Sequence, residues 1–454
     1  MYKSEKKTLV SVLAAFFFLL GVCFFPGSAN AEEYSIKNSY NKVSKDLARI
    51  RGLKFKKAVP YSIKSKDFLR KFLLTNIKAE MPEAKMKAYD TALKTFGFVP
   101  KTFQTFNFMI NLYTDEVAGL YDYNTGQLML MEGKTEVKGM DKSQEQMMAM
   151  YGLNVGDILL IHEMDHAIQD QYFNLKKMLA SVKKYKNDDR ESAVQSLLEG
   201  DATYVMMLYM FDSMSGGSGV DISEFMDMEM VKNMSGDLSM RSGPTFAKAP
   251  LYFKRSMVFP YLDGMVFIEK LRKSGGWAKV NNAYTDPPKS TEQILHPDRY
   301  LLKDDPISIS WIEMPDAIGG WKLLEENTCG EFVIKTMFEN FLPLSNYQSI
   351  AEGWGGDRFR IYEKGNEHFL MWYLTWDREQ DAKEFLKSYI ELLKVKYPGL
   401  AWTKTSPNKA YLGRIGNDHV YLAINGKDVL LIEGCQPELT QAILKIGWYV
   451  KKSR

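Results

Sequence analysis

The sequence is poor in the residues that form disulfides and thiolate metal sites. It has 3 cysteines and 5 histidines among 454 residues. Cys23 lies in an N-terminal apolar stretch, and neither Cys329 nor Cys435 belongs to a Cys-x-x-Cys arrangement. Thiolate zinc and redox chemistry therefore have no support. Cys329 and Cys435 could pair in an oxidising compartment, but we expect two isolated buried thiols.

Long runs of one charge are also absent. The formal net charge is +3, and three lysines and one glutamate among the first seven residues supply two of these positive charges. The rest of the chain is nearly neutral, which excludes a polyanion partner such as nucleic acid. A hydrophobic content of 45% and a charged content of 25% are typical of a soluble globular protein, and the length favours two or three domains.

Beyond the N-terminus, no segment is apolar for long enough to cross a bilayer. At the N-terminus, lysines precede an apolar stretch at 9–25, which ends before Pro26 and Ala29-Asn30-Ala31. This order is typical of an export signal with a small-x-small cleavage site. We predict a signal peptide at 1–31 and an exported protein, either secreted, periplasmic or in the cell envelope. An uncleaved N-terminal membrane tether is the alternative.

Two of the five histidines have metal-ligand spacing. Residues 159–171 read LLIHEMDHAIQDQ, with His162 and His166 four apart and Glu163 directly after the first. On a helix these histidines lie one above the other, so both imidazoles can reach one ion. Glu163 is about 100° round the helix, within reach of a water on that ion. The motif predicts a Zn²⁺ site with Glu163 as general base; the alternative is two surface histidines paired with carboxylates.

The third ligand decides the subclass of such a site. Gln169 and Tyr172 stand where a metzincin needs glycine and then histidine or aspartate, which excludes that class. Asp170 lies a full turn beyond His166 and is badly placed for the same ion. Glu199 lies in SLLEGDATYVMM, on a second and largely apolar helix, where a carboxylate needs a partner such as a dication. A glutamate at a polar seam without a metal is the alternative.

Several motifs resemble a known family. Residues 199–202, EGDA, are similar to the E-G-x-A signature in which aminopeptidase-type gluzincins present their third zinc ligand. The set HEMDHAIQDQ, LLEGDATYV, FPYLDG, PPKSTEQILHP and GWGGDR resembles an exported, mostly uncharacterised zincin-like family, over roughly residues 115–390. The resemblance implies a gluzincin-like core with His162, His166 and Glu199 on zinc and Glu163 as general base.

The residues that would hydrogen-bond to the metal ligands differ from the thermolysin-like pattern. Thr203 stands four residues after Glu199, where those enzymes carry an aspartate. Asp201 is about 200° round the helix from Glu199 and cannot simply replace it. We expect Asp201 at most to hydrogen-bond behind the ligands. The sequence does not show which residue orients His162.

These parts predict a metallopeptidase that acts on a peptide or protein substrate. The reaction needs a further donor to the oxyanion. His296 in TEQILHP is the first candidate and Tyr261 the second, and a loop-packing role is the alternative for His296. The strand GQLMLM is the candidate edge to which a peptide would add. A zincin-shaped, non-enzymatic envelope binding or maintenance protein is the alternative function, although a purely structural zinc site has no use for Glu163.

The predicted fold class is α+β. We expect a hairpin at 118–131, a helix that begins after Asn154 and a helix at 190–211. The C-terminal part should have a β-β-α-β-β-β-α order, with a tight turn at Asn425-Gly426. The expected regions follow the signal peptide in this order: a helical region at 32–110, a zincin-like catalytic domain at 111–350 and a small α+β domain at 355–454.

Overall fold

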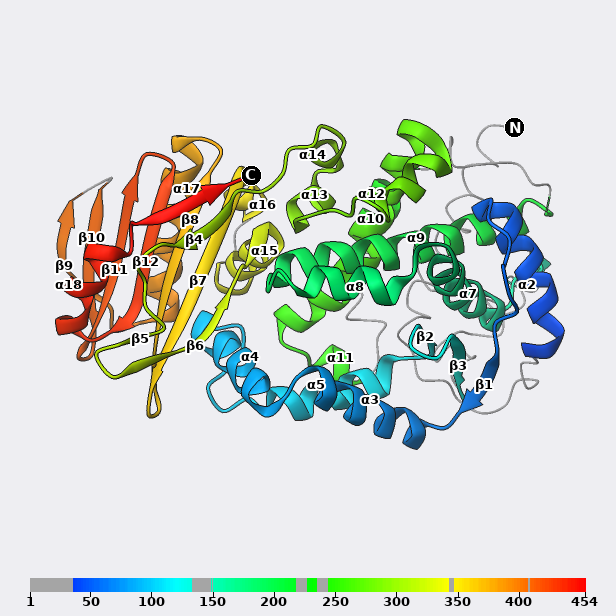
Figure 1. The fold of residues 1–454 in the computed structure, drawn as a ribbon, viewed down its shortest axis with the longest axis horizontal. Coiled ribbons are helices and arrows are strands. Elements are labelled where there is room, and N and C mark those ends of the chain that lie inside the picture. Colours follow the sequence, from blue (N-terminus) through cyan, green and yellow to red (C-terminus); the bar gives the residue numbers. More distant parts are fainter. Residues whose placement is uncertain are drawn as a thin grey trace.

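The protein is mainly helical at one end and carries a large antiparallel sheet at the other (Figure 1). This computed structural model describes residues 36–132, 148, 150–217, 227–234, 244–342, 347–406 and 409–454. The segregation of helices and sheet confirms the α+β class. The predicted signal peptide lies outside the described residues. Within them, no helix combines the length and the apolar character that a bilayer crossing requires.

The N-terminal region is helical, as predicted, but it also contributes a strand. Its helices are α2 (Ile36–Arg51), α3 (Lys66–Glu80), α4 (Glu83–Phe96) and α5 (Thr105–Glu116). The unexpected strand is β1 (Tyr61–Lys64), which pairs in parallel with β3 (Gln127–Met131). A four-residue strand with half of its side chains exposed has too little apolar pattern to be recognised in a sequence.

The hairpin predicted at 118–131 is confirmed. β2 (Gly119–Asp122) and β3 pair antiparallel around a four-residue turn. The sheet order is β1-β3-β2. β3 carries GQLMLM and is the central strand, so the predicted edge is wrong: the edge strands are β1 and β2.

Three long helices form the centre of the helical part: α7 (Val155–Phe173), α9 (Asp188–Met214) and α12 (Leu251–Ala283). The Asn154 side chain caps α7 and accepts a hydrogen bond of 2.7 Å from the Gly156 amide, as predicted. The shorter helices around them are α8 (Leu175–Lys183), α10 (Met228–Met234), α11 (Pro244–Ala247), α13 (Thr291–Leu295) and α14 (Pro297–Leu301).

α9 and α12 cross in direct backbone contact. A Cβ added at Gly264 would lie 2.2 Å from the Ser196 carbonyl oxygen, and one added at Gly200 would lie 2.2 Å from the Gly264 carbonyl carbon. Only glycine permits this approach. The glycines of EGDA and FPYLDG therefore set the separation of the two helices beside Glu199.

The large sheet has eight strands in the order β5-β6-β7-β8-β12-β11-β10-β9, and all neighbours are antiparallel. The strands are β5 (Ala317–Ile318), β6 (Trp321–Asn327), β7 (Trp354–Lys364), β8 (Glu367–Trp376), β9 (Ala401–Ser406), β10 (Ala410–Ile415), β11 (Asp418–Asn425) and β12 (Asp428–Cys435). The helices that follow β6, β8 and β12 are α15 (Gly330–Phe341) with α16 (Tyr347–Ala351), α17 (Glu379–Lys396) and α18 (Pro437–Ile446).

The predicted boundary at residue 355 falls inside this sheet, because β6 pairs with β7 and extends the sheet upstream. The predicted meander is present as β10, β11 and β12. The strands β9 and β13 (Val450–Ser453) were missed, since their polar sequences carry little strand pattern. β13 pairs with β4 (Ser308–Trp311) in a separate two-stranded sheet. Cys329 and Cys435 are buried free thiols, as expected.

Candidate metal centre and adjoining cavity

The two motif histidines and Glu199 converge. His162 Nε2 and His166 Nε2, from α7, each lie 3.3 Å from Glu199 Oε2 on α9. These three ligand atoms all lie within 4.8 Å of one another. Two ligands about 2.0–2.1 Å from a tetrahedral ion are themselves about 3.3 Å apart, which is the spacing found between each imidazole and the carboxylate. Two imidazoles and one carboxylate are also a donor set that suits Zn²⁺.

The electrostatics of this group favour a positive charge. Burial alone would disfavour a charged His166, but Glu199, Glu163 and Asp165 outweigh burial and raise its pKa to about 10. Burial would raise the pKa of Glu199, yet the two imidazoles hold it well below its usual value. A proton or a metal ion can supply the positive charge that the carboxylates require.

Glu163 lies under the edge strand of the small sheet. A Cβ added at Gly119 of β2 would lie 2.9 Å from Glu163 Cγ, so glycine lets the strand approach this side chain. The Tyr121 backbone N–H donates a hydrogen bond to the Glu163 carboxylate, and burial raises the pKa of Glu163. The hairpin thus fixes the predicted base beside the ligands.

Gln169 holds His166 in place. Its side-chain Oε1 lies 3.2 Å from His166 Nδ1, and its Nε2 donates to Asp165 Oδ2 at 2.7 Å and to the Leu198 carbonyl at 3.0 Å. Because Gln169 Oε1 can only accept, His166 Nδ1 must carry the proton, and this leaves Nε2 free to bind a metal. From the sequence alone, Gln169 only excludes a metzincin, and its contact with His166 is not predictable.

Asp201 lies behind the ligands and ties α9 to α2. Its Oδ2 accepts hydrogen bonds from Arg51 Nη2 at 2.9 Å and from the Tyr284 hydroxyl at 2.7 Å. The side chains of Arg51 and Asp201 are wholly buried, and the guanidinium lies 4.3 Å from the Trp277 ring centroid. Burial and the nearby charge of Asp201 raise the pKa of Asp165 to about 7. Sequence reasoning missed Arg51, which is 150 residues from its partner.

Tyr261, rather than His296, lies beside the candidate metal ligands. The Tyr261 ring stacks on the His162 ring with centroids 5.9 Å apart, and Tyr261 lines the same cavity as Glu163. His162 Nδ1 has no hydrogen-bond partner among the described residues, so ring packing holds this imidazole. Tyr261 is therefore better placed than His296 to be the oxyanion donor.

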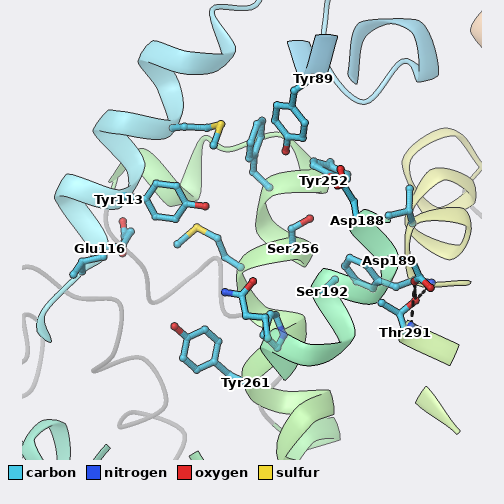
Figure 2. A pocket seen from close by; sticks show the side chains of 18 of the residues that line it. Tyr89, Tyr113, Glu116, Asp188, Asp189, Ser192, Tyr252, Ser256, Tyr261 and Thr291 are labelled. Atoms are coloured by element: carbon cyan, nitrogen blue, oxygen red, sulfur yellow. Dashed lines mark hydrogen bonds between the residues drawn. The ribbon is translucent and has the colours of Figure 1, made fainter. Parts of the chain in front are cut away.

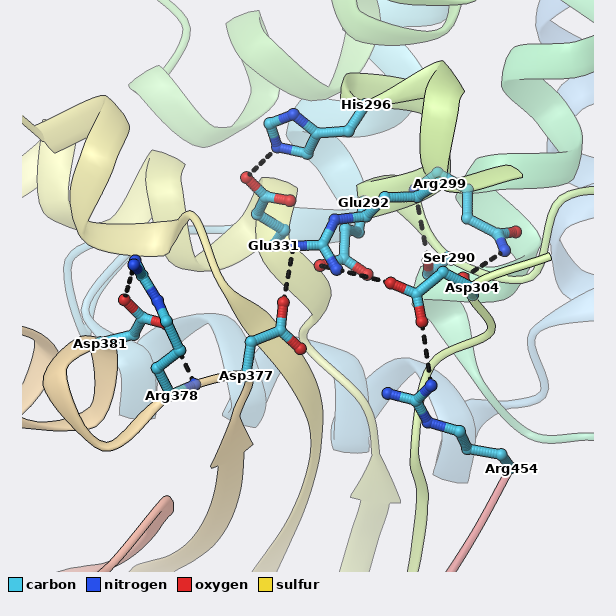
Figure 3. Close-up of polar contacts among 11 residues, drawn as sticks. Ser290, Glu292, His296, Arg299, Asp304, Glu331, Asp377, Arg378, Asp381 and Arg454 are labelled. Carbon is cyan, nitrogen blue, oxygen red and sulfur yellow. Dashed lines mark hydrogen bonds and ion pairs between the residues drawn. The ribbon is translucent and has the colours of Figure 1, made fainter. Parts of the chain in front are cut away.

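The structure places His296 in a different polar cluster (Figure 3). Its Nε2 lies 2.9 Å from Glu331 Oε1, and this hydrogen bond raises the pKa of His296. Arg299, one turn further on, bonds to Asp377 at 2.6 Å and joins this region to the large sheet. The TEQILHP segment thus contacts α15, and Arg299 just after it contacts the large sheet. This arrangement favours the alternative in which His296 has a packing role.

A cavity of about 280 Å³ adjoins the candidate metal centre (Figure 2). His162, Glu163 and Tyr261 line it, and its walls come from α4, α5, α7, α9, α12 and the start of α15. In Figure 2, Tyr89 and Tyr252 lie at one end and Tyr261 at the other. The candidate base and a candidate ligand thus face a partly open cavity close to the lower end of the size range of ligand-binding sites.

Comparisons with known proteins say little about this centre. Residues 322–444 match a family described as a domain of unknown function (DUF8575), and this range excludes the candidate ligands. No curated protein matches the sequence. A crystal structure from Chloroflexus aurantiacus, described as "a putative hydrolase with a novel fold", matches with 16% identity and a TM-score of 0.35. The match covers 64% of this chain and 96% of that chain. A similarity this low carries no argument about function.

Proposed function

We propose that the protein is an exported, zinc-dependent metallopeptidase of the gluzincin type. The observation that carries the proposal is the convergence of His162, His166 and Glu199, from two helices, on one point beside a cavity. Glu163 faces the same cavity. A purely structural zinc site has no use for such a carboxylate, since four protein ligands normally close it.

In this proposal His162, His166 and Glu199 hold the metal. A bound zinc ion would supply Lewis-acid polarisation of the scissile carbonyl and acidification of a water. Glu163 takes a proton from the attacking water and delivers it to the leaving amine. The Tyr261 hydroxyl is the candidate donor to the developing oxyanion, in place of His296.

The edge strand β2 is the proposed docking site for the peptide backbone. β2 pairs with the central strand β3 on one side, and its other side has no strand partner among the described residues. A peptide that adds to β2 as an extra strand would pass next to Glu163, because Gly119 packs on this side chain. The hairpin would then align the scissile bond with the base.

Metal analysis and peptide hydrolysis test this proposal together. We expect the purified protein to contain about one zinc per chain, as tetrahedral catalytic sites do. It should hydrolyse members of a quenched peptide library and lose this activity to a chelator. Restoring zinc should restore it. Protein that holds zinc but cleaves no peptide would instead favour the non-enzymatic envelope role.

A further inference from the structure

One wall of the cavity beside the candidate metal centre is a single face of α5. Met109, Tyr113 and Glu116 lie at successive turns of this helix, and all three line the cavity. The wall continues beyond the helix to Gly119 of β2, which packs on Glu163. α5 therefore leads from the proposed docking strand β2 away from the candidate base.

The first part of α12 lines the same cavity. Tyr252, Ser256 and Tyr261 face it and follow one another along the helix in Figure 2. Tyr261 stacks on His162, so this part of the helix is beside the candidate ligands. Tyr252 precedes Tyr261 by nine residues, and at 1.5 Å per residue it lies about 14 Å away along the helix axis. An extended peptide covers this distance with about four residues.

Aromatic side chains close the cavity at the Tyr252 end. The Phe253 ring of α12 packs against Phe108 of α5, with ring centroids 5.3 Å apart, so the two helices meet there. Tyr89 of α4 reaches the same end, where Figure 2 shows it next to Tyr252. Burial raises the pKa of Tyr89 well above its usual value, and a hydrogen bond that its hydroxyl donates to Tyr252 adds to this effect. These contacts form an end wall that connects α4, α5 and α12.

A second cavity lies on the other side of this end wall. Its volume is about 490 Å³, and its lining residues come from 81–94 and 103–109. Tyr89 and Met109 line both cavities, so these two side chains are a shared wall. Three methionines and two phenylalanines make much of the lining of the second cavity apolar. The protein therefore has room for a longer chain, which Tyr89 and Met109 separate from the candidate base.

We propose that Tyr89 and Met109 limit how far a peptide substrate extends from the scissile bond. This inference rests on the proposed function and names the substrate class of the same site: peptides cleaved within about four residues of one chain end. A chain that adds to β2 and follows α5 passes the candidate base and meets Tyr89 after about 14 Å. A longer chain on that side collides with the shared wall.

The positions at which the zinc-loaded protein cuts unstructured peptides of graded length test this limit. The peptides repeat one sequence, so that every position offers the same side chains, and mass spectrometry of the first products locates each cut. We expect cuts within about four residues of one end, and at least about tenfold slower cutting of bonds further from it. In Tyr89→Ala the two cavities join, and this difference should fall to about twofold or less.

Three further variants show whether the shared wall is responsible. Tyr89→Phe keeps the ring and should keep the limit, because the wall acts through its volume. Tyr449→Ala removes the same type of side chain from a residue that is 57% exposed and lines neither cavity, so it should leave the cut positions unchanged. Should Tyr89→Ala fail to fold, Met109→Ala removes the other shared side chain and should likewise relax the limit.

Wild-type cutting that is as fast far from both chain ends as near them would overturn the limit and leave the proposed peptidase function intact. The same cut positions in the wild type, Tyr89→Ala and Met109→Ala would also overturn it, since a merely structural role would lower all rates together without moving the cuts. A zinc-loaded wild-type protein that cuts none of the peptides would overturn the proposed function, and the limit with it.

Discussion

At the residue scale, the three candidate ligands could be predicted from the sequence. The residues that hold them in place could not. The spacing of His162 and His166 is a local property of one helix, and Glu199 stood out as a carboxylate in an apolar helix. The Arg51–Asp201 ion pair joins residues 150 apart, which no local pattern reveals. The sequence motif favours His296 over Tyr261 as the oxyanion donor, because a sequence does not show which side chains face a site.

Glu199 and Asp201 should behave differently when changed, although they are two residues apart. Glu199→Ala removes a candidate ligand, so we expect zinc content, measured by elemental analysis, to fall to a small fraction of one per chain. Asp201→Asn keeps the ligands and should retain most of the zinc. It should still destabilise the fold by about 3 kcal/mol, because Arg51 stays buried without its counter-charge. Full zinc occupancy in Glu199→Ala would show that another residue ligates.

Gln169 should affect zinc binding through its contact with His166. Gln169→Met removes the acceptor for His166 Nδ1 without a large change in volume, and we expect zinc affinity to fall about 10- to 100-fold. Gln171→Met is the matched control, because Gln171 bonds to residues 56 and 57 and not to a ligand. Competition with a zinc-binding dye measures both variants. Equal affinities would exclude Gln169 as a positioning residue.

At the scale of elements, the helices and the hairpin could be predicted, but their contacts could not. The pattern of 118–131 predicts two strands and a turn, yet it does not show that β1 pairs with β3 and makes β3 the central strand. Likewise, the sequence marks EGDA and FPYLDG as motifs but shows no physical role for their glycines. That role is the backbone contact between α9 and α12.

Gly264→Ala should therefore destabilise the protein strongly. The added methyl group would lie 2.2 Å from the Ser196 backbone oxygen, so the helices must separate next to Glu199 and Tyr261. We expect a loss of about 3 kcal/mol in unfolding free energy and weaker zinc binding. Gly399→Ala, where a Cβ meets nothing within 4 Å, is the control. Equal denaturation midpoints for the two variants would contradict the close crossing.

At the scale of the whole molecule, the sheet and the helical part share a core. Phe96 of α4 packs edge-on against Phe359 and Trp372 of the sheet, with centroids 5.1 and 5.3 Å away. Asp357, in GWGGDR, accepts hydrogen bonds from the Cys329 and Gly330 amides at the start of α15. The change in sequence texture near residue 355 suggested a boundary, but texture does not report which strands pair.

Two fragments test whether the C-terminal folding unit includes β5 and β6 or begins at residue 355. Residues 305–454 contain every strand of the large sheet and the β4–β13 pair, whereas 355–454 lacks β5, β6 and α15. We expect cooperative thermal unfolding of 305–454, at a lower temperature than the whole chain because the contact with Phe96 is lost. The shorter fragment should show no cooperative transition in circular dichroism. A cooperative transition in 355–454 would restore the boundary predicted from the sequence.

The central claim is that His162, His166 and Glu199 bind zinc for a hydrolysis in which Glu163 is the base. Peptide turnover by Glu163→Gln, measured on the same preparation as its zinc content, tests it most directly. The account predicts wild-type zinc content and a loss of turnover of at least about a hundredfold, since only the proton acceptor is removed. Unchanged turnover in zinc-loaded Glu163→Gln would contradict the account.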